Sequence, residues 1–161
     1  MSTLRIDPAT PADVPVIRTL IRELAEFEHL EHEANATEEQ LREALFGPQP
    51  SAEVLIARMD DEVAGFALYF HNFSTFVGRR GLYLEDLFVR PRFRRMGCGA
   101  ALLKRLARIA VERNCGRMEW AVLNWNQRAI DFYRSLGAVP MSEWTTYRLT
   151  GEALEALGRE K

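Results

Sequence analysis

The sequence contains few of the residues that would hold a metal or a disulfide framework. Its two cysteines are Cys98 and Cys115, and its three histidines lack the spacing of a metal motif, so we expect no metal and no disulfide. No run approaches the roughly 18 consecutive apolar residues that span a bilayer, and no cationic and then apolar signal stands at the N-terminus. These absences favour a cytoplasmic protein without membrane contact.

An excess of charge is also missing, since the formal net charge is −2 at pH 7. A chain this close to neutral has no general attraction to nucleic acid, and its aromatic residues do not interleave with its basic clusters at 90–95 and 104–108. With 47% hydrophobic and 27% charged residues, the 161 residues fit one globular domain, residues 1–161, around one core.

The hydrophobic patterning predicts an α+β (mixed α/β) chain without repeats or a linker. We expect strands at residues 4–6, 54–58, 63–70, 82–89, 118–123 and 143–149. We expect helices at residues 11–28, 37–47, 100–114, 127–136 and 152–157. Thr37 begins its helix with a capping-box pattern, the acidic turn at residues 60–62 closes a hairpin, and residues 71–81 are expected to form a loop.

A glycine-containing segment stands between the strand at 82–89 and the helix that begins near Ala100. A helix N-terminus presents unpaired N–H groups and about half a positive charge, which together suit a pyrophosphate. Gly97 and Gly99 let the backbone approach such a group closely, while Arg94 and Arg95 add positive charge. Taken alone, the segment fits an ordinary tight turn as well as an anion site.

The spacing of this segment excludes two common nucleotide loops, G-x-x-x-x-G-K-[ST] and the three-glycine dinucleotide fingerprint. Arg94, Gly97 and Gly99 instead form an R-x-x-G-x-G pattern, which resembles the acetyl-CoA loop of the GNAT superfamily of N-acetyltransferases, usually written Q/R-x-x-G-x-G/A. The strand at 82–89, the N-x-x-A-x-x-F-Y motif at 126–133 and the helix segment at 22–28 resemble its diamine acetyltransferase branch, which includes thialysine acetyltransferases.

The resemblance implies a GNAT-like fold and a homodimer. Its sheet would be largely antiparallel and twisted, with helices on both faces and a V-shaped splay between the two parallel strands at 82–89 and 118–123. Acetyl-CoA would lie in the V, with its pantetheine bonded like an added strand to the backbone of Leu87 and Val89. The resemblance implies that acetyl-CoA is bound by Leu87, Phe88, Val89, Arg94, Arg95, Met96, Gly97, Cys98, Gly99, Ala100, Asn126, Arg128, Ala129 and Tyr133.

Acetyl transfer to an amine requires a neutral nitrogen, whereas a lysine-like amine has a pKa of about 10.4. A carboxylate beside the amine can hold the cation and then receive its proton. Glu85, which matches the family's glutamate, is the candidate base, because in a regular strand Asp86 points to the other face. Tyr133 matches the family's general acid for the CoA thiolate. The amine attacks the thioester directly in a ternary complex, so we do not expect Cys98 to be a nucleophile.

The branch also implies an acceptor site. Its residues would be Phe27, Glu28, Glu85, Asp86, Glu119, Trp120 and Ala121. Ser74 stands where the spermine-type enzymes carry an aspartate, and residues 143–148 are rearranged relative to their acidic pair and tryptophan. We therefore predict acetylation of a primary amine of a small diamine or a lysine-like amino acid. The alternatives are a peptide or protein amine acetyltransferase and a non-catalytic CoA-binding sensor.

Overall fold

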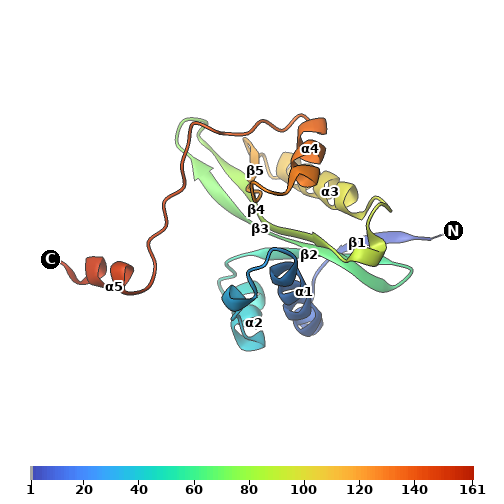
Figure 1. Cartoon of the computed structure of the whole chain (residues 1–161), viewed down its shortest axis with the longest axis horizontal. Coiled ribbons are helices and arrows are strands. Elements are labelled where there is room, and N and C mark those ends of the chain that lie inside the picture. The colour runs from blue at the N-terminus through green and yellow to red at the C-terminus, as the bar shows by residue number, and fades with distance from the viewer. Residues whose placement is uncertain (1) are drawn as a thin grey trace. The chain divides into compact units, whose positions relative to one another are not determined.

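A mixed sheet of five strands organises the fold, which we describe for residues 2–161 from a computed structural model (Figure 1). The strands are β1 (Leu4–Pro8), β2 (Glu53–Met59), β3 (Glu62–Ser74), β4 (Arg79–Val89) and β5 (Met118–Trp120). They lie in the order β1-β2-β3-β4-β5, with antiparallel pairing up to β4 and parallel pairing between β4 and β5.

Five α-helices accompany the sheet. They are α1 (Val14–Phe27), α2 (Glu38–Phe46), α3 (Cys98–Glu112), α4 (Gln127–Ser135) and α5 (Gly151–Arg159), with short 3₁₀ turns at Pro11–Asp13, Glu31–Glu33 and Pro91–Phe93. The chain divides into two compact units, the first ending at Ala121 and the second comprising Val122–Lys161. The first unit contains the whole sheet with α1, α2 and α3, and the second contains α4 and α5.

The two faces of the sheet are covered by different helices of the first unit (Figure 1). One face packs against α1 and α2 through Val14, Ile17, Leu20, Leu24, Leu41, Leu45, Val54, Ile56, Phe66 and Phe88. Because side chains alternate along a strand, Leu55 and Ala57 of β2 point to the opposite face, which α3 covers with Leu102 and Leu106. The mixed α/β class with helices on both faces is confirmed.

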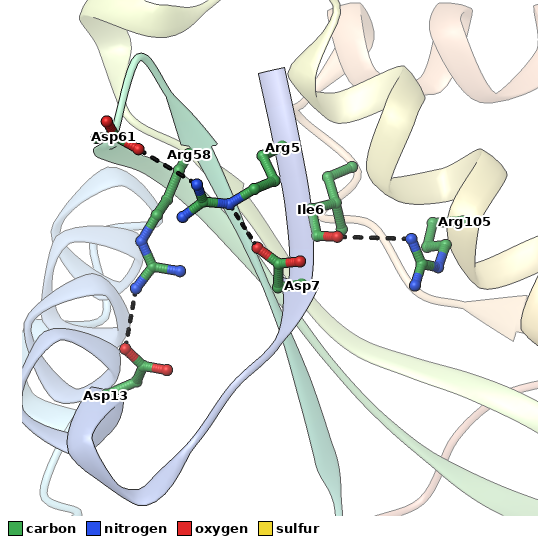
Figure 2. Close-up of polar contacts among 7 residues, drawn as sticks. All are labelled: Arg5, Ile6, Asp7, Asp13, Arg58, Asp61 and Arg105. Atoms are coloured by element: carbon green, nitrogen blue, oxygen red, sulfur yellow. Dashed lines mark hydrogen bonds and ion pairs between the residues drawn. The ribbon is translucent and has the colours of Figure 1, made fainter. Parts of the chain in front are cut away.

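Polar contacts fasten the β1 edge of the sheet (Figure 2). Arg58 of β2 pairs with Asp13 at 2.9 Å, at the start of α1, in a largely buried position. Arg5 of β1 contacts Asp7 at 2.7 Å, and α3 reaches the same strand because the Arg105 guanidinium donates to the Ile6 carbonyl at 3.5 Å. The edge strand is therefore tied to elements on both faces.

Most of the expected helices and strands form close to their expected bounds, but two expectations are wrong. Residues 71–81 are not a loop, because β3 runs on to Ser74 and β4 begins at Arg79, with pairing from His71↔Leu82 to Ser74↔Arg79. Polar side chains do not prevent this pairing, because the bonds of the ladder join main-chain groups. The strand expected at 143–149 is absent among the described residues, since no neighbouring strand pairs with it.

The parallel ladder between β4 and β5 is short. It consists of Leu82↔Met118, Tyr83↔Glu119 and Leu84↔Trp120, and β5 ends at Trp120 rather than at the expected residue 123. β4 continues beyond the ladder to Val89. The pairing between the two parallel strands therefore ends at Leu84.

Close packing of β3 against the last residues of β4 should make Gly65 intolerant of a larger side chain. A Cβ at Gly65 would lie 2.3 Å from the Phe88 carbonyl oxygen and 3.0 Å from Val89 Cα. We expect Gly65→Ala to lower the free energy of unfolding by about 1–3 kcal/mol in urea titrations, because backbone atoms must shift. The matched control is Gly158→Ala, whose Cβ would meet nothing within 4 Å. Equal stabilities of the two variants would contradict the close approach.

Candidate functional site

The candidate site begins with a β-bulge at the end of the β4–β5 ladder. Leu84 pairs with Tyr69 while Asp86 pairs with Leu68, which leaves Glu85 as the extra residue on β4. Leu68 packs against the core on the α1 face, so its partner Asp86 lies on that face too. The regular alternation that underlay our choice between Glu85 and Asp86 is therefore interrupted between them.

Three carboxyl groups gather around this bulge. Glu85 is exposed, Asp86 is partly buried, and Glu28 directly follows the last residue of α1. Burial, together with the negative charges of Glu85 and Glu28, raises the pKa of Asp86 to about 7. Burial also raises the pKa of Glu28. We call Glu28, Glu85 and Asp86 the carboxyl cluster, and its chemistry suits a cation.

Strand β5 brings a fourth carboxylate to the neighbouring ladder position. Glu119 pairs with Tyr83 in the parallel register and forms an ion pair with Arg117 at 3.2 Å. Burial and the charges of Glu85 and Glu119 raise the pKa of the Tyr83 phenol. Trp120 is partly buried and Ala121 is exposed. The sequence reasoning missed Tyr83, although aligning the two expected parallel strands would have placed it opposite residue 119.

The glycine loop leads from β4 into α3. Gly97 is the N-cap residue of α3 with a φ of 85°, a value in the left-handed region where residues with a side chain are strained. The space beside Gly99 is nearly empty, because a Cβ built there would have only Val89 Cγ2 within 4 Å, at 3.9 Å. Arg95 and Met96 are exposed, and Ala100 is partly buried. Since Gly97 has no side chain, the first turn of α3 has no side-chain cap at that residue.

Two residues of this loop direct their side chains away from its outer surface. Cys98 is 2% exposed and packs with Met59, Ala64 and Phe93, and burial raises the pKa of its thiol. Its side chain is a core group, and the absence of a nucleophilic role for Cys98 stays a prediction. The Arg94 guanidinium lies over the Phe27 ring, and its Nε–H donates to the Val89 carbonyl at 2.9 Å.

The remaining predicted residues belong to the second unit. Asn126 is the N-cap of α4, and its Oδ1 accepts a hydrogen bond from the Ala129 N–H at 3.3 Å. Arg128 is exposed, whereas Tyr133 is partly buried beside Phe132, with ring centroids 5.9 Å apart. Asn126 therefore has a local structural role as a helix cap, and the roles of Arg128 and Tyr133 stay predictions.

Residues 2–161 contain neither a candidate metal site nor a candidate membrane span. Nowhere in that range do three or more His, Cys, Asp or Glu residues come together in a way that would hold a metal ion. Nor does the same range contain a helix of the length and apolar character that crossing a membrane requires.

Comparisons with known proteins agree with this fold. An integron cassette protein from the mobile metagenome of V. cholerae has a solved structure that matches with a TM-score of 0.82 and 30% identity, covering 98% of each chain. Thialysine N-epsilon-acetyltransferase of Mus musculus is 38% identical over 98% of both chains. L-ornithine N5-acetyltransferase of Arabidopsis thaliana is 35% identical over 96% of this chain and 88% of its own length.

The model of the acetyltransferase (GNAT) family matches residues 17–138, which span parts of both compact units. The chain belongs to this family, and it is an N-acetyltransferase. Members of the family take the acetyl group from acetyl-CoA.

The raised pKa of Asp86 predicts a specific pH dependence of stability. Between the ordinary value of 3.8 and about 7, the folded protein binds more protons at Asp86 than the unfolded chain does, so stability falls as pH rises through this window. We expect Asp86→Asn to be more stable than the parent at pH 8 and to lose this advantage at pH 5, as measured by urea unfolding.

The matched control for Asp86→Asn is Glu85→Gln, at the exposed neighbouring carboxylate. It removes only one of the two charges that act on Asp86, so part of the pH dependence should remain. If the stability of Asp86→Asn depended on pH as the parent's does, the raised pKa of Asp86 would be contradicted.

Proposed function

We propose that this N-acetyltransferase acetylates a primary amine of a small diamine or a lysine-like amino acid, with acetyl-CoA as the donor. The observation that carries the proposal is the carboxyl cluster at the end of the β4–β5 ladder. Several carboxylates in one place suit a substrate that has a second cationic nitrogen besides the reacting one. The relatives named for thialysine and L-ornithine support this reading, since both amino acids have two amines.

A long polyamine fits less well, because the far hairpin offers no anion at Ser74. Ser74 is 7% exposed, and its Oγ accepts a hydrogen bond from the Val77 N–H at 3.2 Å. The hydroxyl therefore stabilises the turn between β3 and β4. A carboxylate at this position would instead add a binding point for a distant ammonium group.

In the proposed reaction, Glu85 removes a proton from the acceptor amine. The acceptor is bound by Phe27, Glu28, Asp86, Glu119, Trp120 and Ala121. Holding the reacting amine neutral at pH 7 costs about 4–5 kcal/mol. A carboxylate beside the amine lowers the kinetic barrier by taking the proton within the complex as a general base. The neutral amine then attacks the thioester carbon directly to give a tetrahedral intermediate, which collapses as the C–S bond breaks and the nitrogen releases its second proton to solvent. Tyr133 donates a proton to the CoA thiolate. A backbone N–H of Phe88 or Val89 would stabilise the oxyanion.

For the donor, we propose that the pantetheine bonds to the backbone of Leu87 and Val89, where β4 continues past its ladder with β5. The pyrophosphate would meet the loop from Arg95 to Ala100, through backbone N–H groups and the Arg95 side chain. Asn126, Arg128 and Ala129 would complete the donor site, as the family resemblance implies. We propose no metal in this chemistry.

We further propose that residues 1–161 act as one N-acetyltransferase domain in the cytoplasm. The family model supports one domain because it crosses from the first compact unit into the second. The free thiols of Cys98 and Cys115 support a reducing compartment.

A homodimer is the proposed assembly. The second unit exposes a series of large apolar side chains along its tail: Val139, Met141, Trp144, Tyr147, Leu149, Leu154 and Leu157. Exposed apolar surface of this extent marks an interaction site. The residues at 143–149, which pattern as a strand but pair with none in the described chain, suit pairing with a second copy.

The substrate proposal predicts a clear order in a thiol-release assay with acetyl-CoA. We expect kcat/KM for thialysine, ornithine and lysine to exceed that for spermidine and spermine, because the carboxyl cluster binds a second ammonium only near the reacting amine. Putrescine should fall between the two groups. A strong preference for spermine would contradict the proposal.

The same assay separates an enzyme from a CoA-binding sensor. Tyr133→Phe should lower kcat by about 100-fold or more while CoA affinity, measured by calorimetry, stays close to that of the parent. A sensor would show no thiol release with any amine, in the parent or in the variant.

The dimer proposal predicts that polar substitutions on the tail will separate the subunits. We expect the parent to have twice the chain mass in light scattering and the double variant Trp144→Ser, Tyr147→Ser to shift toward the monomer, because it removes apolar contact area. The control is Phe76→Ser, at a 99% exposed phenylalanine in the β3–β4 turn, which should leave the mass unchanged. A monomeric parent would overturn the proposal.

A further inference from the structure

Two arginines that follow β4 reach the same face of α1. Arg90 forms a two-pronged ion pair with Glu23, because its Nε and Nη2 groups donate to the two carboxylate oxygens at 3.0 Å each. Its Nη1 also donates to the Val63 carbonyl at 3.1 Å. Arg94 lies over the Phe27 ring, with Cζ 4.8 Å from the ring centroid. Glu23 and Phe27 lie one helical turn apart, so both contacts fall on one face of α1.

The Arg94 guanidinium makes contacts through its N–H edge as well as through its planar face. Its Nε–H donates to the Val89 carbonyl at 2.9 Å, and the group also lies 5.7 Å from the centroid of the buried Phe88 ring. The side chain is partly buried, unlike that of its exposed neighbour Arg95. These contacts turn Arg94 toward α1 and the end of β4.

The partners of Arg94 belong to the two halves of the proposed reaction. Val89 ends the part of β4 to which the donor pantetheine would bond, whereas Phe27 directly precedes Glu28 of the carboxyl cluster. We propose that Arg94 is a positioning residue that couples the acetyl-CoA site to the amine site, and that Arg94 is not a pyrophosphate ligand. The Arg90–Glu23 ion pair forms a second connection between the end of β4 and α1. This inference rests on the proposed function for the assignment of the two sites.

Coupling of this kind works in both directions. If CoA holds the end of β4 in place, Arg94 holds Phe27 and Glu28 in place, and the amine then binds more tightly. Linkage requires the amine to favour CoA by the same factor. Lysine cannot replace arginine here, because an ammonium group lacks the planar face that stacks on Phe27 and the Nε–H that bonds to Val89.

The test uses the full chain and compares the parent with Arg94→Lys. The first readout is amide hydrogen exchange of residues 24–30 with and without saturating CoA, which requires no amine. We expect CoA to slow exchange there in the parent and not in Arg94→Lys. The second readout is steady-state kinetics with the best amine of the panel, where we expect the amine KM to rise about 5- to 30-fold in the variant, with CoA affinity within about threefold of the parent.

Three further variants control the interpretation. Arg95→Gln should weaken CoA binding and reduce its salt dependence, but it should keep the CoA-induced protection at saturation and the parent's amine KM. Phe27→Tyr keeps the ring that stacks on Arg94, so the CoA-induced protection of residues 24–30 should remain. Phe27→Leu should raise the amine KM, and combining it with Arg94→Lys should add little, because the two residues act through one contact.

Three results would overturn the proposal. The first is CoA-induced protection of residues 24–30 in Arg94→Lys that equals the parent's. The second is a loss of CoA affinity in that variant with an unchanged amine KM. The third is a double variant in which the two increases in amine KM multiply. Failure of the proposed function looks different, since no amine would then release CoA from the parent while the exchange experiment still reports on coupling. Thermal unfolding of each variant identifies any that fail to fold.

Discussion

The early end of the ladder between β4 and β5 is the constraint on which the site depends. Pairing stops at Leu84, and the bulge at Glu85 follows immediately. From there to Val89, one edge of β4 no longer pairs with β5, and backbone groups in that position bind well to an extended ligand. The bulge also directs Asp86 toward α1, where it meets the charge of Glu28. One irregularity thus lies beside both the proposed donor edge and the carboxyl cluster.

Negative charge lies on β4 and positive charge lies on the loop that follows it, an arrangement that would attract the two proposed substrates to different places. The glycine loop after β4 joins exposed Arg95 to the N-terminus of α3, which suits the anionic end of CoA. The carboxyl cluster before that loop suits a cationic amine. Because the two regions are separated along β4, the proposed donor and acceptor would be attracted to different ends of one short segment. Reactive ends that meet between these regions would lower the entropic cost of the reaction.

The sequence predicted the features that depend on local residue chemistry, and it missed those that depend on pairing. The Thr37 capping box and the helix after the glycine loop follow from neighbouring residues, and both form. The bulge at Glu85 depends on the register between β3 and β4, which no local pattern reveals. The segment at 143–149 alternates like a strand, yet a strand needs a partner, and none in the described chain pairs with it.

The position of Arg94 shows why a motif does not by itself assign a role to each of its residues. The loop pattern admits glutamine as well as arginine at its first position, and glutamine has no charge to offer a phosphate. What the two side chains share is a planar group with N–H donors, which is what a bond to the Val89 carbonyl requires. Arginine adds a cationic face, and Phe27 lies beneath it. The physical demand at this position is therefore a planar donor that bonds to the end of β4, and we propose that phosphate is bound instead by the backbone of the loop and by Arg95.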